Sequence, residues 1–233
     1  MGDNAAVVIV GGTRAIGFEL ARHYVELGRE VVVTGQDPER VAAAARTLGG
    51  GVRGLVFDLA SPHAIGAALA DVGRVQYLVL AAIDRDSNRV DEYDIERALR
   101  LVTLKLVGYT EVVHALRDRL DEESAIVLFG GMAKERPYPG STTVSTVNGG
   151  VVGLTRTLVE ELRPIRVNSI HPGIVGDSPY WAEKPAAVEN YRSQTPTGRL
   201  ASMTDIVGGV AFLLENQAAN GIELLLDGGW HCR

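Results

Sequence analysis

The stretch VVIVGGTRAIGFELA, from Val7 to Ala21, combines three local signals in a fixed order. Its apolar start has the pattern of a buried strand, and apolar residues then recur at helical spacing. Gly11 and Gly12 allow a tight turn between the two, and Gly17 allows the helix to lie close to the sheet. The free N–H groups and the positive dipole end of that helix suit a pyrophosphate. The stretch therefore predicts a strand, a phosphate-binding turn and a helix, with a tight turn that binds nothing as the alternative.

The rest of the chain repeats this alternation of apolar runs and amphipathic segments. Strands that are buried on both faces and separated by helices form a parallel sheet with right-handed crossovers. We therefore expect an α/β protein, a doubly wound Rossmann fold with a seven-stranded parallel sheet and helices on both faces, in one domain over residues 1–233. The expected strands cover residues 5–10, 30–35, 52–58, 76–82, 125–131, 165–170 and 221–229. Helices are expected at about 16–27, from 38, from about 62, over about 93–120, and from about 142 to 162.

The composition limits the compartment and the partners. The chain has 233 residues, a formal net charge of -6 and one cysteine, Cys232. The acidic balance argues against nucleic acid as the main partner, because phosphate backbones require a basic face. No apolar stretch has the length of a membrane span, and the opening residues lack the pattern of a signal peptide. We expect a cytoplasmic protein that binds a small molecule, with no nucleic-acid or membrane partner and no metal.

Several motifs, in order along nearly the whole chain, resemble those of one enzyme family. They are Val10–Gly17, Phe57–Leu59, Val151–Arg156, Arg166–Val175, Thr195–Leu200 and Asp227–Gly229. In this respect the chain is similar to the short-chain dehydrogenases/reductases, which bind a nicotinamide dinucleotide. Ala15 stands where the family pattern TGxxxGIG has its middle glycine, so one methyl group crowds the diphosphate slightly.

The resemblance implies which residues contact the cofactor. They are Gly11, Thr13, Arg14, Ile16, Gly17, Gln36, Asp58, Leu59, Ala81, Ala82, Asn148, Pro172, Gly173, Ile174 and Val175. Asp58 would accept a hydrogen bond from the adenine amino group.

The end of the second strand bears on the choice between NAD(H) and NADP(H). An acid at its tip would bind the ribose hydroxyls of NAD and repel a 2′-phosphate. This chain has Gln36 there, and Asp37 beyond it reads as a helix cap before Pro38. Arg14, in the glycine loop, can reach a 2′-phosphate, as its counterpart often does in the family's NADP-preferring members. We therefore favour NADP(H), with Arg14 as a solvated loop charge as the alternative.

Aligning Val151–Arg156 with the family's catalytic helix puts unusual residues where the family's catalytic residues stand. The tyrosine position becomes Val144, the lysine position four residues later becomes Asn148, and the serine position becomes Gly131. Thr103 stands where the family has an asparagine. Valine cannot donate or accept a proton, and Asn148 can hydrogen-bond a ribose hydroxyl but brings no charge. The resemblance therefore implies cofactor binding without the family's usual proton transfer.

Three side chains are candidates for the catalytic work: Tyr138, Asn148 and His171. Tyr138 lies just before the catalytic helix, on the lip of the expected pocket, unless it only packs on a proline-rich loop. His171 adjoins the segment beside the nicotinamide, and a histidine there can titrate near neutrality. The alternative for His171 is a satisfied ring that ends the strand.

Residues from about 176 to 199 have weak periodicity and are expected to form a substrate lid. Tyr180 to Lys184 is a literal YxxxK, which we interpret as part of a lid helix, with a transplanted acid as the alternative. The aromatic residues of the lid favour an apolar or ring-bearing ligand. The expected substrate pocket consists of Asp84, Gly131, Met132, Val144, Tyr180 and Trp181. A solvated loop is the alternative for Asp84.

Three functions remain open on the sequence. The first is an NADP(H)-dependent oxidoreductase with a non-standard active site, which transfers a hydride with the cofactor's own chemistry. The second is a non-redox enzyme on the same scaffold, such as an isomerase, cyclase or dehydratase. The third is a catalytically inactive nucleotide-binding regulator or a partner subunit in a mixed oligomer. The last helix and the ELLLDGG strand resemble the family's subunit contacts, which implies a homodimer or homotetramer.

Overall fold

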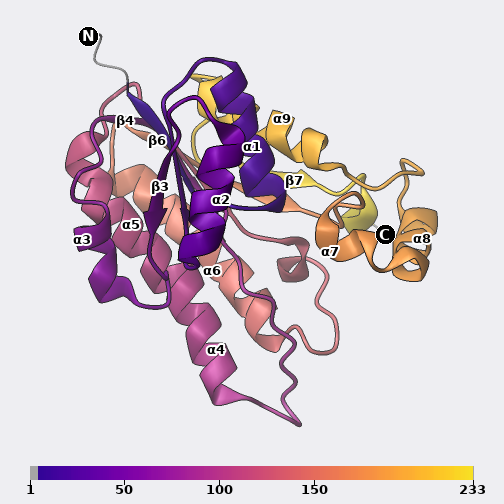
Figure 1. The fold of residues 1–233 in the computed structure, drawn as a ribbon. Helices are drawn as coiled ribbons and strands as arrows, with labels where there is room; N and C mark the ends of the chain where they lie inside the picture. Colours follow the sequence, from indigo (N-terminus) through magenta and orange to yellow (C-terminus); the bar gives the residue numbers. More distant parts are fainter. Residues whose placement is uncertain (1–4, 233) are drawn as a thin grey trace.

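The computed structural model describes residues 5–232, which form one parallel sheet between two layers of helices (Figure 1). The strands are β1 (Ala6–Val10), β2 (Val31–Gly35), β3 (Arg53–Val56), β4 (Val75–Leu80), β5 (Ala125–Phe129), β6 (Arg166–Pro172) and β7 (Glu223–Leu226). Their order in the sheet is β3-β2-β1-β4-β5-β6-β7, and every neighbouring pair is parallel. The predicted doubly wound, seven-stranded sheet is confirmed. Positions 1–4 and 233 of the predicted domain lie outside the described residues.

Helices cover both faces of this sheet. They are α1 (Ala15–Glu26), α2 (Pro38–Leu48), α3 (Ile65–Ala68), α4 (Ile95–Val102), α5 (Tyr109–Leu116), α6 (Thr142–Glu161), α7 (Pro179–Ala182), α8 (Pro185–Gln194) and α9 (Met203–Glu215). Successive strand residues point to opposite faces. Val7 and Ile9 therefore pack in the layer of α1 and α9, whereas Val8 and Val10 pack in the layer of α3, α5 and α6. Burying each such side chain contributes about 1.5–3 kcal/mol to folding.

Two predicted helices differ from the observed ones. The helix expected from about residue 62 is only a 3-10 turn (Pro62–Ala64) followed by the single turn of α3. The glycines Gly66 and Gly73 in this segment lower its helix propensity. The long helix expected over about 93–120 is divided by a π-helical turn, Thr103–Gly108, between α4 and α5. The wider turn buries both Leu104 and its neighbour Lys105.

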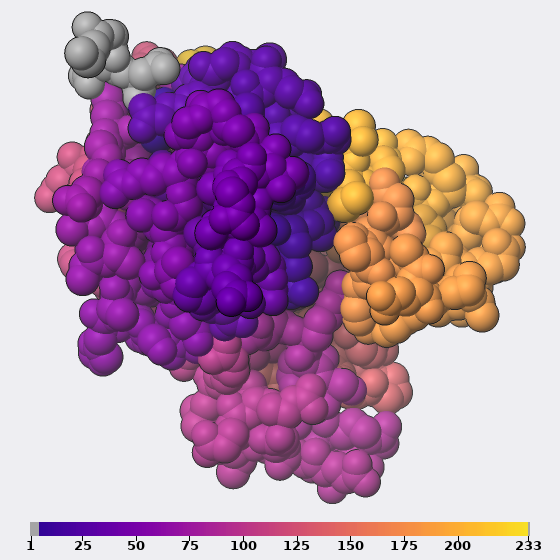
Figure 2. Space-filling view, viewed as in Figure 1, coloured from indigo at the N-terminus to yellow at the C-terminus, as the bar shows by residue number. Residues whose placement is uncertain are grey.

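The topology places one crevice at the carboxyl edge of the sheet. The chain winds outward from β1 in one direction through β2 and β3, and in the other through β4 to β7. Ligands of such sheets bind outside the strand ends at the point where the direction reverses. The predicted lid, with α7 and α8, follows β6 at this edge and stands out from the body of the molecule (orange in Figure 2). Helix α4 and the loop before it project separately (magenta in Figure 2).

Candidate active site

The glycine loop between β1 and α1 brings the chain into very close contact with itself. A Cβ atom on Gly17 would lie 2.1 Å from the carbonyl oxygen of Gly11, so no larger residue fits at the start of α1. Ala15 has a φ of 48°, in the left-handed region that a Cβ atom disfavours. Arg14 precedes the helix and provides no side-chain cap. The first N–H groups of α1 therefore have no side-chain cap, as anion binding at a helix start requires.

A cleft lies between this loop and the carboxyl ends of β2, β3 and β4. It is lined by Val10, Gly11, Thr13, Arg14, Thr34, Gly35, Gln36, Arg40, Phe57, Asp58, Leu59, Ala81, Ala82, Ile83, Asp84 and Leu104. The hydroxyl of Thr34 is buried and has no hydrogen-bond partner among residues 5–232. A buried polar atom of this kind requires an external partner. The cations of Arg14 and Arg40 line the same cleft, and Arg40 also pairs with Asp37 at 3.1 Å, so the lining is compatible with an anionic ligand.

Two sequence predictions around this cleft can be placed directly. Asp37 accepts a hydrogen bond from the backbone N–H of Arg40 at 3.0 Å, so it caps α2 as predicted. Asp84, which was expected in the substrate pocket, lines this cleft and pairs with an arginine from a neighbouring helix.

That arginine, Arg100 on α4, is a site residue that sequence reasoning missed. Its Nε donates to Asp84 Oδ2 at 2.7 Å, and its Nη1 donates to Asp58 Oδ2 at 3.0 Å. Its Nη2 donates to Gln36 Oε1 at 2.9 Å and to Asp58 Oδ1 at 3.3 Å. The only signal in the sequence is a cation inside the amphipathic segment ERALRLV, which cannot show where the side chain points.

Helix α6 presents a wall that carries no charge. Val144 and Asn148 lie on it four residues apart and therefore on one face. Asn148 is 3% exposed, so its amide is buried in this wall. A Cβ atom on Gly131 would lie 2.9 Å from Asn148 Nδ2. The asparagine amide thus occupies the space beside the position where a serine side chain would begin.

His171, at the end of β6, lies beneath this wall and is fully buried. Its Nδ1 accepts a hydrogen bond from the Gly131 N–H at 3.2 Å, so Nε2 carries the proton and donates to Ser169 Oγ at 3.1 Å. Burial, together with the charge of Lys134, lowers the pKa of His171 to about 4. The expectation that this histidine titrates near neutrality is wrong, because both ring nitrogens are used in a dry site. The alternative of a satisfied ring describes it.

A second unpredicted contact joins Lys105, in the π-helical turn, to Tyr109, the first residue of α5. Lys105 is 1% exposed, and its Nζ donates to Phe129 O at 2.6 Å and to Tyr109 Oη at 2.8 Å. Tyr109 Oη in turn donates to Ala82 O at 2.8 Å. Burial lowers the pKa of Lys105 to about 7 and raises the pKa of Tyr109 well above its usual range. The pair ties the carboxyl ends of β4 and β5 together beneath the site.

The lid is held by a chain of aromatic rings. Tyr180, Trp181, Tyr191 and Trp230 contact one another edge to face, with centroids 5.1, 5.6 and 5.9 Å apart. The guanidinium of Arg85, from the loop after β4, lies 3.7 Å from the centre of the Tyr180 ring, and Lys184 Nζ lies at the same distance. Lys184 and Arg85 lower the pKa of Tyr180. The lid is thus fastened to the loop that follows β4.

The remaining predicted residues lie along the same edge. Tyr138 is 53% exposed in the loop before α6, and burial of part of its ring raises its pKa. Met132 is buried in the 3-10 turn after β5. The segment Pro172–Val175 continues from β6, where the Gly173 N–H donates to Leu226 O at 2.9 Å. This segment is next to β7 and does not line the cleft around Asp58.

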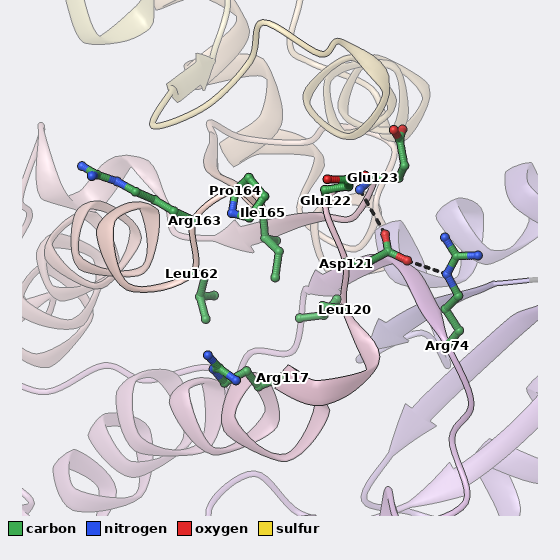
Figure 3. A pocket seen from close by; sticks show the side chains of 10 residues that line it. All are labelled: Arg74, Arg117, Leu120, Asp121, Glu122, Glu123, Leu162, Arg163, Pro164 and Ile165. Atoms are coloured by element: carbon green, nitrogen blue, oxygen red, sulfur yellow. Dashed lines mark hydrogen bonds and ion pairs between the residues drawn. The ribbon is translucent and has the colours of Figure 1, made fainter.

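A hollow at the opposite, amino-terminal edge of the sheet has none of these features (Figure 3). It is lined by Arg74, Arg117, Leu120, Asp121, Glu122, Glu123, Leu162, Arg163, Pro164 and Ile165. Asp121 pairs with Arg74 at 2.5 Å and accepts from the Glu123 N–H at 3.0 Å. Across residues 5–232, no cluster of three His, Cys, Asp or Glu side chains has a metal-binding arrangement. None of the described helices combines the length and apolarity that a bilayer crossing needs.

Comparison with known proteins agrees with this geometry. The family model described as "Enoyl-(Acyl carrier protein) reductase" matches residues 10–231. A 3-oxoacyl-[acyl-carrier-protein] reductase from Bos taurus is 30% identical over 229 residues, which cover 95% of each chain. The short-chain reductase protein NovJ from Streptomyces niveus is 28% identical over 97% of this chain and 94% of its own. The structure of the MalC reductase/Diels-Alderase from Malbranchea aurantiaca superposes with a TM-score of 0.91 at 25% identity, covering 99% and 97% of the two chains.

The parallel sheet, the glycine loop at its switch point and a match over nearly the whole length lead to one assignment. The chain belongs to the short-chain dehydrogenase/reductase family of oxidoreductases.

Proposed function

We propose that the protein is an NADP(H)-dependent oxidoreductase that acts on a small apolar or ring-bearing substrate without the family's usual proton donor. The observation that carries the proposal is the nucleotide cleft, with its closely packed glycine loop and the unpartnered Thr34 hydroxyl. The preference for NADP(H) is supported by Gln36 at the tip of β2 and by Arg14 and Arg40 beside it. Because the residue at that tip is a glutamine and not an acid, it does not repel a 2′-phosphate.

The neutral wall narrows the class of reaction. A bound nicotinamide supplies or accepts a hydride at the substrate carbon. Val144 cannot protonate an alkoxide, and losing a general acid costs about two to four powers of ten in rate. Activated C=C and C=N bonds depend less on such an acid than ketones do. The buried Asn148 amide is proposed to hydrogen-bond a ribose hydroxyl or a substrate oxygen, and the aromatic lid to exclude water from the substrate.

A non-redox reaction in the same pocket is the second candidate. The wall of Val144, Asn148 and Gly131 carries no proton donor of the usual kind, and a structurally similar protein is named as both a reductase and a Diels-Alderase. In that case the lid and the wall would shape a substrate, and the nucleotide would be structural or absent. A regulator or partner subunit without activity remains the third hypothesis, and no feature of the site favours it over these two.

The test begins with calorimetric titration of NADPH and NADH, followed by cofactor oxidation with panels of cyclic ketones, imines and enones. We expect NADPH to bind and enones or imines to be reduced faster than ketones. Arg14→Met should weaken NADPH binding by about tenfold or more, because it removes one charged hydrogen bond. Arg22→Met, on the solvent side of α1, is the matched control and should bind normally. If the nucleotide binds but no substrate of the three panels causes cofactor oxidation, the oxidoreductase proposal is contradicted. Product formation without nucleotide would support the second candidate.

We also propose a cytoplasmic homodimer or homotetramer. The apolar side chains of Ile95 and Leu99 on α4 are 61% and 56% exposed, and Phe212 on α9 is 47% exposed. Exposed apolar residues that gather on helices are typical of subunit contacts. Sedimentation should give a dimer or tetramer, and a monomer at micromolar concentration would contradict this proposal.

A further inference from the structure

Arg100 lies beside the cleft and hydrogen-bonds three residues that line it, each of which follows a different strand. Its partners follow β2 (Gln36), β3 (Asp58) and β4 (Asp84). Four hydrogen bonds leave this one guanidinium, two of them to the same carboxylate. Forked pairing of this kind is both strong and geometrically specific.

This arrangement changes what Asp58 can do for a nucleotide. Oδ2 accepts from Arg100 Nη1 at 3.0 Å. Oδ1 accepts from the Ala60 N–H at 2.9 Å and from Arg100 Nη2 at 3.3 Å. Both oxygens of the carboxylate expected to receive the adenine amino group are therefore already engaged. An incoming adenine would therefore share this acceptor with a cation, through the lone pair that remains on Oδ2.

The position of Gln36 shows where the arginine would go instead. Gln36 stands at the tip of β2, where such folds hold the second hydroxyl of the adenosine ribose. Arg100 Nη2 lies 2.9 Å from its side-chain oxygen, so the guanidinium lies beside the position where that hydroxyl would be held. The Arg100 side chain is 41% exposed and can therefore move within the cleft mouth. A 2′-phosphate there carries about two negative charges and would be a stronger partner than either carboxylate.

From these contacts we infer that Arg100 adds to the discrimination between the two nucleotides, by exchanging partners. In the structure it pairs with both Asp58 and Asp84. A 2′-phosphate draws it away, which frees Asp58 to accept from adenine and frees Gln36 to turn its amide N–H groups toward the phosphate. A nucleotide without the phosphate shares Asp58 with Arg100 and offers the cation no new partner. This inference rests on the proposed binding of a nicotinamide dinucleotide and adds a source of its specificity.

The test measures affinity by calorimetry and needs no turnover. NADPH and NADH are titrated into the wild type and into Arg100→Met, and the fragments 2′,5′-ADP and 5′-AMP serve as probes of the adenosine end alone. In Arg100→Met we expect NADPH and 2′,5′-ADP to weaken by about ten- to a hundredfold, since a charged contact to phosphate is lost. We expect NADH and 5′-AMP to bind as well as before or more tightly, because Asp58 is then unoccupied. Arg100→Lys should retain part of the preference.

Arg97→Met is the matched control. Arg97 lies on the same helix, and its partner is Asp86, at 3.3 Å, outside the cleft. It should leave the ratio of NADPH to NADH affinity unchanged. Equal weakening of both nucleotides in Arg100→Met, or no change in either, would overturn the inference while leaving the proposed function intact. A wild type that binds neither nucleotide would overturn the proposed function and the inference together. Thermal unfolding of each variant verifies that it folds.

Discussion

Ala15 has a backbone conformation that glycine adopts without strain. The left-handed φ of 48° costs a residue with a Cβ about 1–2 kcal/mol, against the 0.5–1 kcal/mol that glycine loses in chain entropy. Ala15→Gly should therefore raise the free energy of unfolding by about 0.5–1 kcal/mol and tighten NADPH binding. Chemical denaturation and calorimetry measure the two effects. Ala42→Gly, at an exposed position of α2, is the control and should destabilise by about 1 kcal/mol. A destabilised Ala15→Gly protein would contradict the strain.

Lys105 gives a second prediction for a single residue, through its depressed pKa. The unfolded chain binds a proton at this lysine up to about pH 10.5, but the folded chain only up to about pH 7. The unfolded state therefore holds more protons between these values, so the free energy of unfolding rises with pH across this window, by roughly 3–5 kcal/mol from this group. Lys105→Met should remove that rise, as denaturation at several pH values above 7 would show. An identical slope in both proteins would exclude a neutral buried lysine.

His171 produces the same direction in a lower window. Its folded pKa of about 4 lies below its unfolded value of 6.5, so its stabilising effect is complete above pH 6.5 and is lost as the pH falls toward 4. The Lys105→Met comparison is therefore made above pH 7, where His171 is neutral in both states.

At the scale of the elements, the family's usual catalytic residues can be restored by substitution on α6 and in the loop that precedes it. The variant Gly131→Ser, Val144→Tyr, Asn148→Lys restores the three polar positions, and we expect it to reduce ketones about 10²- to 10⁴-fold faster than the wild type. The matched control carries Val144→Phe with the same two partners, and it should gain nothing because its ring has no hydroxyl. Initial rates with NADPH and a cyclic ketone measure both. Equal rates in the two triple variants would mean that the register assigned to α6 is incorrect.

The elements also show why some features could be predicted from the sequence and others could not. Buried strands and the cap at Asp37 are local patterns, and the structure confirms them. The π-helical turn at Thr103–Gly108 could not be predicted, because apolar periodicity continues through it. Arg100 and Lys105 acquire their roles only where strand ends far apart in the chain meet, so their letters carry no local signal. The burial of His171 depends in the same way on the packing of Gly131 above it.

On the scale of the whole molecule, the lid contributes a reporter of its own state. The protein has two tryptophans, and both belong to the aromatic chain: Trp181 in α7 and Trp230 near the carboxyl terminus. Movement of the lid should therefore be the main cause of any change in the intrinsic tryptophan fluorescence. We expect substrate, added to the nucleotide complex, to shift this emission, and we expect Trp181→Phe to lose most of the shift. Emission that stays constant while substrate turns over would show that the lid does not move.

Helix α4 has a different role on each side. One side holds Arg100 against the ends of three strands, and the other leaves Ile95 and Leu99 uncovered. A second chain packed on the uncovered side would contact the same helix that carries the guanidinium. Nucleotide binding that displaces α4 in one subunit would then displace α4 of the neighbouring subunit. Successive nucleotides would bind cooperatively, with saturation curves steeper or shallower than a hyperbola.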